Sequence, residues 1–165
     1  MSLTPLARRA FGLAFAVFAL DQALKLWALF VFELGDKGRV PVAPLFDLVL
    51  VWNTGVSYGL LQQDSEFGRW ALVALHVVAS IAITFWILRE TDRPSSIGLA
   101  LILGGAVGNG VDRVAYGAVV DYALLHWGDV TWYVFNLADA AIVAGVVLLL
   151  YGSLRSSKSA TGVSS

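Results

Sequence analysis

Residues 104–113 read GGAVGNGVDR and carry an apolar, glycine-rich run directly into a polar one. Gly104 and Gly108 form a GxxxG patch, which in apolar helices is typical of close helix packing. Asn109 and Arg113 are four residues apart and therefore share one face of a helix. The stretch predicts a packed apolar helix whose last turns carry a polar, positively charged spot. A simple snorkelling anchor is the alternative for Arg113.

The apolar character of this stretch extends along the chain. Of its 165 residues, 58% are hydrophobic and 14% are charged, against about 45–50% and about 25% in soluble domains. A helix needs roughly 20 apolar residues to span a bilayer. Four apolar stretches approach that length: 11–32, 70–88, 97–111 and 134–151. The third reaches it only if it extends to Tyr116. We expect an all-α membrane fold, a four transmembrane helix bundle in one domain over 1–155. A disordered, Ser-rich cytoplasmic tail over 156–165 is expected to follow.

Three groups of basic residues fall on one side of these four spans: Arg8 with Arg9, Arg89 with Arg93, and Arg155 with Lys158. The positive-inside rule makes that side cytoplasmic. Both termini are therefore expected inside, and the segments 33–69 and 112–133 outside. Within the first outer segment, apolar residues alternate with their neighbours over 46–53, which is a strand period. This predicts a small extracytoplasmic β-sheet resting on the membrane surface.

Several functions are disfavoured by what the composition lacks. The net charge of −1 offers no basic stripe for nucleic acid, so we expect no nucleic-acid partner. The absence of cysteine excludes a cysteine nucleophile, a disulfide framework and a thiolate metal site. His76 and His126 have no Ser-His-Asp or HExxH partners, and His76 is interpreted as a hydrogen-bonded packing residue. Neither a metal nor an organic cofactor is expected.

Ionisable residues within a span cost about 2.5 to 3.5 kcal/mol at the helix centre, so each is a candidate functional residue. Asp21 and Lys25 are spaced i, i+4 and can neutralise each other, which favours structural support over catalysis. Asp112 either pairs with Arg113 or caps nearby backbone.

Asp121 and Asp139 are the remaining candidates, both on the outer side of the predicted topology. Asn136 lies three residues before Asp139, and we expect both on one helix face, with Asp139 one to two turns inside the fourth span. Two carboxylates brought together can share one proton, so that one activates water while the other polarises a carbonyl. This is aspartic-protease chemistry. Membrane carboxylates also serve ion and proton pathways, so a small ion- or proton-coupled transporter is the alternative.

Five short motifs follow one another along the chain: DQALK at 21–25, NTG at 53–55, GGAVGN with DR within 104–113, VVDY at 119–122 and FNLAD at 135–139. In this order they resemble the lipoprotein signal peptidases, or signal peptidase II, of bacteria. The resemblance implies a membrane endopeptidase that removes the signal peptide from prolipoproteins, cleaving before a diacylglyceryl-modified cysteine. It also implies a monomer in the plasma (inner) membrane, in contact with membrane lipid, with its active site near the outer face.

The resemblance also implies roles for individual residues. Asp121 and Asp139 would be the catalytic pair. Substrate-binding positions would be Asn53, Gly55, Asn109, Arg113 and Asn136, and structural support would come from Asp21, Lys25 and Asp112. The family is blocked by the cyclic peptide globomycin, so sensitivity is implied here. The chain departs from the family pattern at 56–58, where Tyr58 stands in place of the more usual Phe, so the fit of inhibitor or substrate there stays open.

The topology makes a prediction that cysteine labelling can check. A cysteine replacing Asp64 is expected to react with an impermeant thiol reagent in intact cells, and one replacing Asp92 is not, because the basic groups keep the 92 side inside. The chain has no native cysteine to interfere. Labelling at position 92 without labelling at position 64 would show that the topology is inverted.

Overall fold

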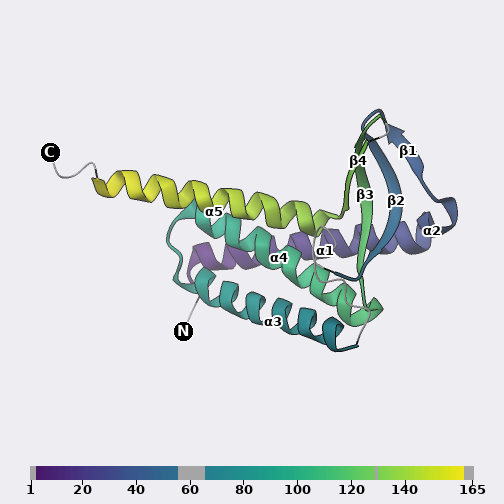
Figure 1. Cartoon of the computed structure of the whole chain (residues 1–165). Coiled ribbons are helices and arrows are strands. Elements are labelled where there is room, and N and C mark those ends of the chain that lie inside the picture. Colours follow the sequence, from purple (N-terminus) through teal and green to yellow (C-terminus); the bar gives the residue numbers. More distant parts are fainter. Residues whose placement is uncertain (1–2, 56–65, 129, 162–165) are drawn as a thin grey trace.

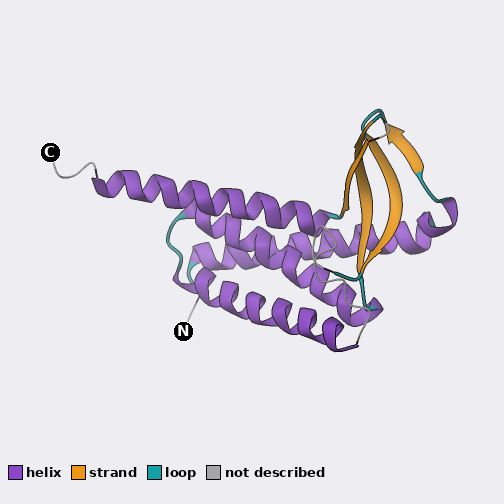
Figure 2. Cartoon of the chain, viewed as in Figure 1, coloured by secondary structure: helices purple, strands orange, loops and turns teal. Residues whose placement is uncertain are grey.

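The computed structural model describes residues 3–55, 66–128 and 130–161. Its helices are α1 (Pro5–Leu26), the π-helical continuation η1 (Trp27–Val31), α2 (Leu34–Lys37), α3 (Glu66–Arg89), α4 (Arg93–Tyr116) and α5 (Leu137–Thr161). Its strands are β1 (Val40–Ala43), β2 (Phe46–Asn53), β3 (Val119–Trp127) and β4 (Val130–Phe135). Four helices within this part are long and apolar enough to cross a membrane, and the sheet lies at one end of them (Figure 1 and Figure 2). The expected bundle of four apolar helices with a small sheet is confirmed.

Helix α4 is the most buried of the four long helices and packs against α1, α3 and α5. A Cβ atom added to Gly104 would lie 2.6 Å from the carbonyl oxygen of Ala14 in α1. A Cβ atom added to Gly105 would lie 2.5 Å from the carbonyl oxygen of Ala138 in α5. Both neighbouring helices therefore approach α4 backbone to backbone, where only glycine leaves room. A Cβ atom added to Gly108 would lie 2.6 Å from Oδ2 of Asp21 in α1, so the prediction of close packing at Gly104 and Gly108 is confirmed.

The two ends of α4 have clear local causes. At its start, Asp92 accepts a hydrogen bond from the backbone N–H of Ser95 at 2.9 Å, and Pro94 occupies the first turn. At its end, Gly117 has a φ of 79°, a left-handed conformation that glycine adopts without strain. The N–H of Gly117 donates to the carbonyl of Arg113 at 3.1 Å. This cap turns the chain from α4 towards β3.

The sheet is antiparallel with the strand order β1-β2-β3-β4, and its strands run across the direction of the helices (Figure 1). In the register of β2 with β3, Val51 lies opposite Asp121 and Asn53 lies opposite Val119. The pairing shifts between Leu48 and Val51, which marks an irregularity of the bulge type. The sheet thereby holds the end of β2 beside the start of β3, next to the last turn of α4.

The sequence predicts only the strand at 46–53, whereas the structure adds β1, β3 and β4. The first half of β3 is almost entirely buried, so its residues show no alternation that would reveal a strand. Residues 134 and 135 belong to β4, and the fourth long helix begins at Leu137 instead of Val134. A short apolar run of this kind cannot be distinguished from a helix by periodicity.

The C-terminal segment also differs from expectation. Helix α5 continues to Thr161, through residues 156–161 that were expected to be disordered. A helix that is already formed extends at little cost per residue, which explains the continuation. Residues 162–165 lie outside the described residues.

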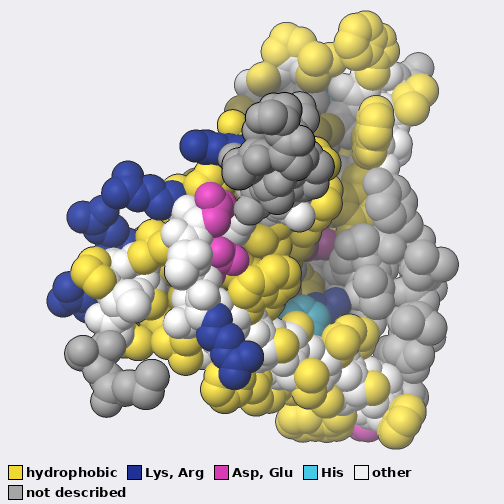
Figure 3. Space-filling model, turned by 90° about the vertical axis from the view of Figure 1, so that its left-hand side faces the viewer, with side chains coloured by type: hydrophobic (Ala, Val, Ile, Leu, Met, Phe, Trp, Pro, Cys, Tyr) yellow, Lys and Arg dark blue, Asp and Glu magenta, His cyan; other side chains and the backbone are white. Residues whose placement is uncertain are grey.

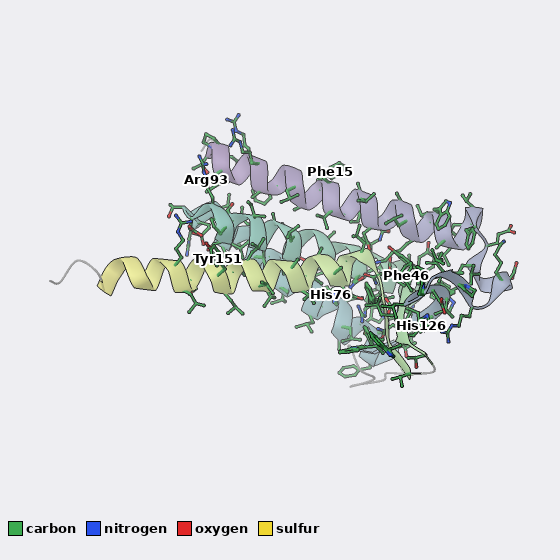
Figure 4. All side chains as sticks on the ribbon, turned by 90° about the horizontal axis from the view of Figure 1, so that it is seen from above. Phe15, Phe46, His76, Arg93, His126 and Tyr151 are labelled. Atoms are coloured by element: carbon green, nitrogen blue, oxygen red, sulfur yellow. The ribbon has the colours of Figure 1, made fainter. Side chains whose placement is uncertain are left out.

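The outward faces of the long helices are apolar. Phe15 in α1, Phe85 in α3 and Val147 in α5 are 70%, 58% and 60% exposed, and Figure 4 shows Phe15 pointing away from the bundle. Exposed apolar surface of this extent is not found on ordinary soluble monomers. Together with the four apolar helices, it identifies a multi-pass membrane protein.

Both chain termini lie at the end of the bundle opposite the sheet (Figure 1). The exposed basic residues near this end are Arg8, Arg9, Arg89, Arg93 and Arg155. Figure 3 views the molecule from this end and shows Lys and Arg side chains around it. The grouping of basic residues on one side, read from the sequence, is therefore present in three dimensions.

The close packing of α4 against α5 predicts that Gly105→Ala destabilises the protein by about 1–3 kcal/mol. The added methyl would lie 2.5 Å from the Ala138 carbonyl oxygen and 2.8 Å from Cγ1 of Ile142. Gly12→Ala is the matched control, because a Cβ there meets no atom within 4 Å. Its melting temperature should stay level or rise, since alanine favours helix. Tryptophan fluorescence in detergent measures the melting temperatures of both variants. Equal melting temperatures of Gly105→Ala and Gly12→Ala would contradict the close packing of α4 against α5.

Candidate active site

All the site residues predicted from the sequence lie in one region, where α1, α4 and α5 meet the sheet. Side-chain and backbone contacts join them into a single continuous network. Its members are Asp21, Lys25, Asn53, Gly55, Asn109, Asp112, Arg113, Asp121, Asn136 and Asp139.

Lys25 forms the innermost part of this network. Its Nζ atom lies 2.7 Å from Oδ2 of Asp21 and 2.8 Å from Oδ2 of Asp112, and it donates to Oδ1 of Asn109 at 3.0 Å. The expected pairing of Asp21 with Lys25 is present. The sequence left two alternatives for Asp112, an ion pair with Arg113 or a cap on nearby backbone. The ion pair of Asp112 is with Lys25 and not with Arg113. The cap is observed, because Oδ2 of Asp112 accepts a hydrogen bond from the backbone N–H of Val120 at 3.1 Å.

Asn109 and Asn136 carry the network outward from Lys25. Asn109 donates from Nδ2 to Oδ1 of Asp139 at 2.8 Å, and its Oδ1 accepts from Nδ2 of Asn136 at 3.1 Å. Asn136 donates from the same Nδ2 to Oδ1 of Asp121 at 2.7 Å. The amide of Asn136 therefore contacts both the Asp121 carboxylate and the amide that holds Asp139.

Asp139 lies in the first turn of α5, so the expectation that it lies one to two turns inside the span is wrong. The side chain of Asn136 accepts from the backbone N–H of Asp139 at 2.9 Å, and the carboxylate of Asp139 accepts from the backbone N–H of Asn136 at 3.3 Å. This reciprocal pair is a capping box. It starts the helix at Leu137 and fixes the Asp139 carboxylate at the helix N-terminus, where negative charge is favoured.

Asp121 lies on β3 and is 1% exposed. Besides Asn136, it accepts a hydrogen bond from Nδ2 of Asn53 at 3.0 Å. Burial, reinforced by the negative charge of Asp139, raises the pKa of Asp121 to about 7, against the lowering effect of the bonds from Asn53 and Asn136. Near neutral pH this carboxyl is therefore poised between its acid and its base forms.

Arg113 contributes a buried positive charge that acts on both Asp121 and Asp139. Its Nη2 atom donates to the carbonyl oxygen of Gly55 at 2.6 Å. The N–H of Gly55 in turn donates to Oδ1 of Asn53 at 3.1 Å. Arg113 thus holds the chain that follows β2, and this chain holds the Asn53 that contacts Asp121.

A cavity of about 310 Å³ opens beside Asp121, and the residues that line it include Trp52, Asn53, Gly55, Trp132 and Tyr133. It offers space for an extended chain alongside the sheet. Among the described residues, no group of three or more His, Cys, Asp or Glu side chains is placed to hold a metal ion. The departure from the family pattern at 56–58 lies outside the described residues.

Sequence reasoning missed Gln22 as a member of the site. Its Nε2 atom donates to Oδ1 of Asp112 at 3.0 Å and to the carbonyl of Gly108 at 3.3 Å. The sequence does contain a signal for Gln22, because a polar amide inside an apolar span and next to Asp21 indicates a buried polar contact.

Comparison with known proteins identifies the family. The model of the family described as signal peptidase (SPase) II matches residues 13–155. The chain belongs to the signal peptidase II family. It is therefore a peptidase, and it is a multi-pass bacterial membrane protein. The resemblance on the five sequence motifs is confirmed.

Curated relatives and solved structures agree with this assignment to the signal peptidase II family. A lipoprotein signal peptidase of Nitrobacter hamburgensis is 53% identical over 155 residues, covering 92% of this chain and 94% of that protein. One of Rhodopseudomonas palustris is 55% identical over 140 residues, covering 82% and 85%. A bacterial membrane enzyme solved by the in meso method at 2.3 Å resolution has the same fold, with a TM-score of 0.81 at 22% identity over 95% of this chain and 94% of that one.

The raised pKa of Asp121 predicts how stability depends on pH. Between pH of about 4 and about 7 the folded protein keeps a proton on Asp121 that the unfolded chain, with an ordinary pKa of 3.8, has lost. The folded state therefore binds more protons, and stability falls as pH rises through this window and is level above it. Asp121→Asn removes this proton. Its melting temperature should fall less between pH 5 and pH 8 than that of the wild type, and equal slopes would refute the raised pKa.

Proposed function

We propose that this peptidase is an intramembrane aspartic endopeptidase that removes the signal peptide from diacylglyceryl-modified prolipoproteins by cleaving before the lipidated cysteine. The observation that carries this proposal is the amide bridge from Asp121 through Asn136 and Asn109 to Asp139. The relatives named lipoprotein signal peptidase support the choice of substrate. Asn53, Gly55, Asn109, Arg113 and Asn136 would bind and orient the substrate around the two carboxylates.

In this proposal the two carboxylates divide acid and base work. Asp121 is buried and has a pKa of about 7, which suits it to hold a proton and donate it to the carbonyl oxygen of the scissile peptide. Asp139 is half-buried and takes a proton from water, which then attacks the carbonyl carbon. When the tetrahedral intermediate collapses, the C–N bond breaks, Asp139 gives the proton it took from water to the leaving cysteine nitrogen, and a hydroxyl of the intermediate returns a proton to Asp121.

The position of the site suits a substrate that arrives within the membrane. The pair lies at the sheet end of the bundle, and the exposed basic groups of Arg8 with Arg9, Arg89 with Arg93, and Arg155 lie at the other end. By the positive-inside rule, the proposal places both termini in the cytoplasm and the site near the outer face of the bacterial plasma membrane. A monomer surrounded by lipid would receive the diacylglyceryl cysteine laterally at this depth.

The alternative of an ion- or proton-coupled transporter is less consistent with the architecture. Transporter sites are typically built near the bilayer midplane from discontinuous helices. Here Asp121 lies on a strand and Asp139 in the first turn of α5, so both carboxylates lie where helices meet the sheet.

The direct test is cleavage of a defined precursor. The purified protein in detergent is incubated with a diacylglyceryl-modified prolipoprotein and, separately, with the same precursor lacking the lipid. A mass loss equal to the signal peptide from the lipidated precursor alone is the expected result. Cleavage of neither precursor, or equal cleavage of both, would reject the proposed substrate.

The proposed pair predicts that Asp121→Asn and Asp139→Asn each lower turnover by at least about 100-fold, because each removes the shared ionisation and preserves size. The double variant should be scarcely slower than either single variant, since residues that act as one unit are strongly non-additive. Turnover is measured per folded molecule on the lipidated precursor. Multiplicative losses in the double variant would contradict a shared mechanism.

Asp21→Asn and Asp112→Asn are the matched controls for this prediction, since they change buried carboxylates that contact Lys25 instead of substrate. Each should lower melting temperature or yield at least as much as turnover per folded molecule. If Asp21→Asn or Asp112→Asn folded like the wild type and were as inactive as Asp139→Asn, the carboxylate replaced in that variant would have to be counted as catalytic.

A further inference from the structure

His76 lies outside the five motifs and outside the network described above, yet it borders it. It is on α3, half-buried, at a point where α3 and α4 come close: a Cβ on Gly110 would lie 3.2 Å from the Cβ of His76. Figure 4 shows His76 towards the end of the bundle that carries the sheet. A glycine at position 110 therefore makes room for the imidazole beside α4.

The hydrogen bonds of His76 define its tautomer. Its Nδ1 atom lies 2.8 Å from the carbonyl oxygen of Leu72, which can only accept, so Nδ1 carries the proton. In the neutral ring this leaves a lone pair on Nε2, which lies 3.4 Å from Nη1 of Arg113. The guanidinium can only donate. A neutral His76 is thus an acceptor for Arg113, and a protonated one is not.

Arg113 connects His76 to Asp121 through a chain of hydrogen bonds. Its second terminal nitrogen, Nη2, donates to the carbonyl oxygen of Gly55. The N–H of Gly55 donates to Oδ1 of Asn53, and Nδ2 of Asn53 donates to Oδ2 of Asp121. Within the described part of the chain, Nε of Arg113 has no hydrogen-bond partner. Among the described residues, the hydrogen bonds that set the plane of the guanidinium are therefore those to His76 and Gly55.

The geometry points to His76 as a positioning residue that acts through Arg113. Its neutral imidazole holds the guanidinium in the orientation that anchors Gly55, and through Asn53 this keeps Asp121 in place. An apolar side chain of similar volume would fill the space but leave Nη1 of Arg113 without this acceptor. The inference rests on the proposed function, because its main readout is turnover.

The charged groups that face His76 are Arg113 from α4 and Asp139 from α5. Protonation of the imidazole removes the acceptor and places a second positive charge beside Arg113. His76 should therefore support turnover in its neutral form and oppose it when charged.

Two substitutions separate this role from packing. His76→Gln keeps a donor for Leu72 and an acceptor for Arg113, whereas His76→Leu keeps volume and loses both. At pH 7.5 we expect kcat on the lipidated precursor to fall about ten-fold or more in His76→Leu and by less than about three-fold in His76→Gln, with KM little changed. Equal losses in both variants would overturn the inference.

His126→Gln is the matched control, because His126 is the chain's other histidine and pairs with Asp47 on the sheet at 3.2 Å. Its kcat should stay within about two-fold of the wild type.

The His126→Gln protein also leaves His76 as the only histidine, so its imidazole nitrogens can be assigned by ¹⁵N NMR at pH 7.5. A neutral ring protonated on Nδ1 is expected, and a ring protonated on Nε2 would overturn the inference. This readout needs no substrate. If the wild type failed to cleave the lipidated precursor, the proposed function would fail while the state of His76 was still measured.

Discussion

The structure depends on one buried cation. Lys25 is 2% exposed inside a helix that crosses the membrane, where an unpaired ammonium would cost several kcal/mol. Asp21 on the same helix and Asp112 on α4 neutralise it, and Asn109 accepts its remaining hydrogen bond. Because these partners come from two helices, the charge is satisfied only when α1 and α4 are packed in this register. The glycines of α4 allow that packing by letting the helix backbones approach.

The same constraint extends to the carboxylate pair. Asp21, besides binding Lys25, accepts from the backbone N–H of Ala138 at 2.9 Å and so helps to place the first turn of α5. The Oδ1 atom of Asn109 faces Lys25, which turns its Nδ2 towards Asp139. The orientation of an amide that could otherwise flip is thus set by a neighbouring charge. Such prearranged donors cost no reorganisation during reaction, which is the general basis of electrostatic catalysis.

Contacts within one helix could be predicted from the sequence, and contacts between elements could not. The i, i+4 spacing of Asp21 and Lys25 and the apolar length of the spans follow from helix geometry alone. The pairing of Lys25 with Asp112 joins residues far apart in the chain, and no periodicity encodes it. The position of Asp139 was misjudged because the apolar residues of β4 read as the start of a helix, and the capping role of Asn136 became visible only once that strand was known.

We propose that the buried charge of Lys25 orients Asn109 and, through it, the proposed catalytic pair Asp121 and Asp139. The most direct test is the turnover per folded molecule of a variant in which the whole charge cluster is neutral, Lys25→Met with Asp21→Asn and Asp112→Asn. Removing all three charges leaves none unpaired, so this variant should fold better than Lys25→Met alone. Its turnover on the lipidated precursor should nevertheless fall at least about ten-fold, because Asn109 loses its charged donor. Wild-type turnover in the folded triple variant would contradict it.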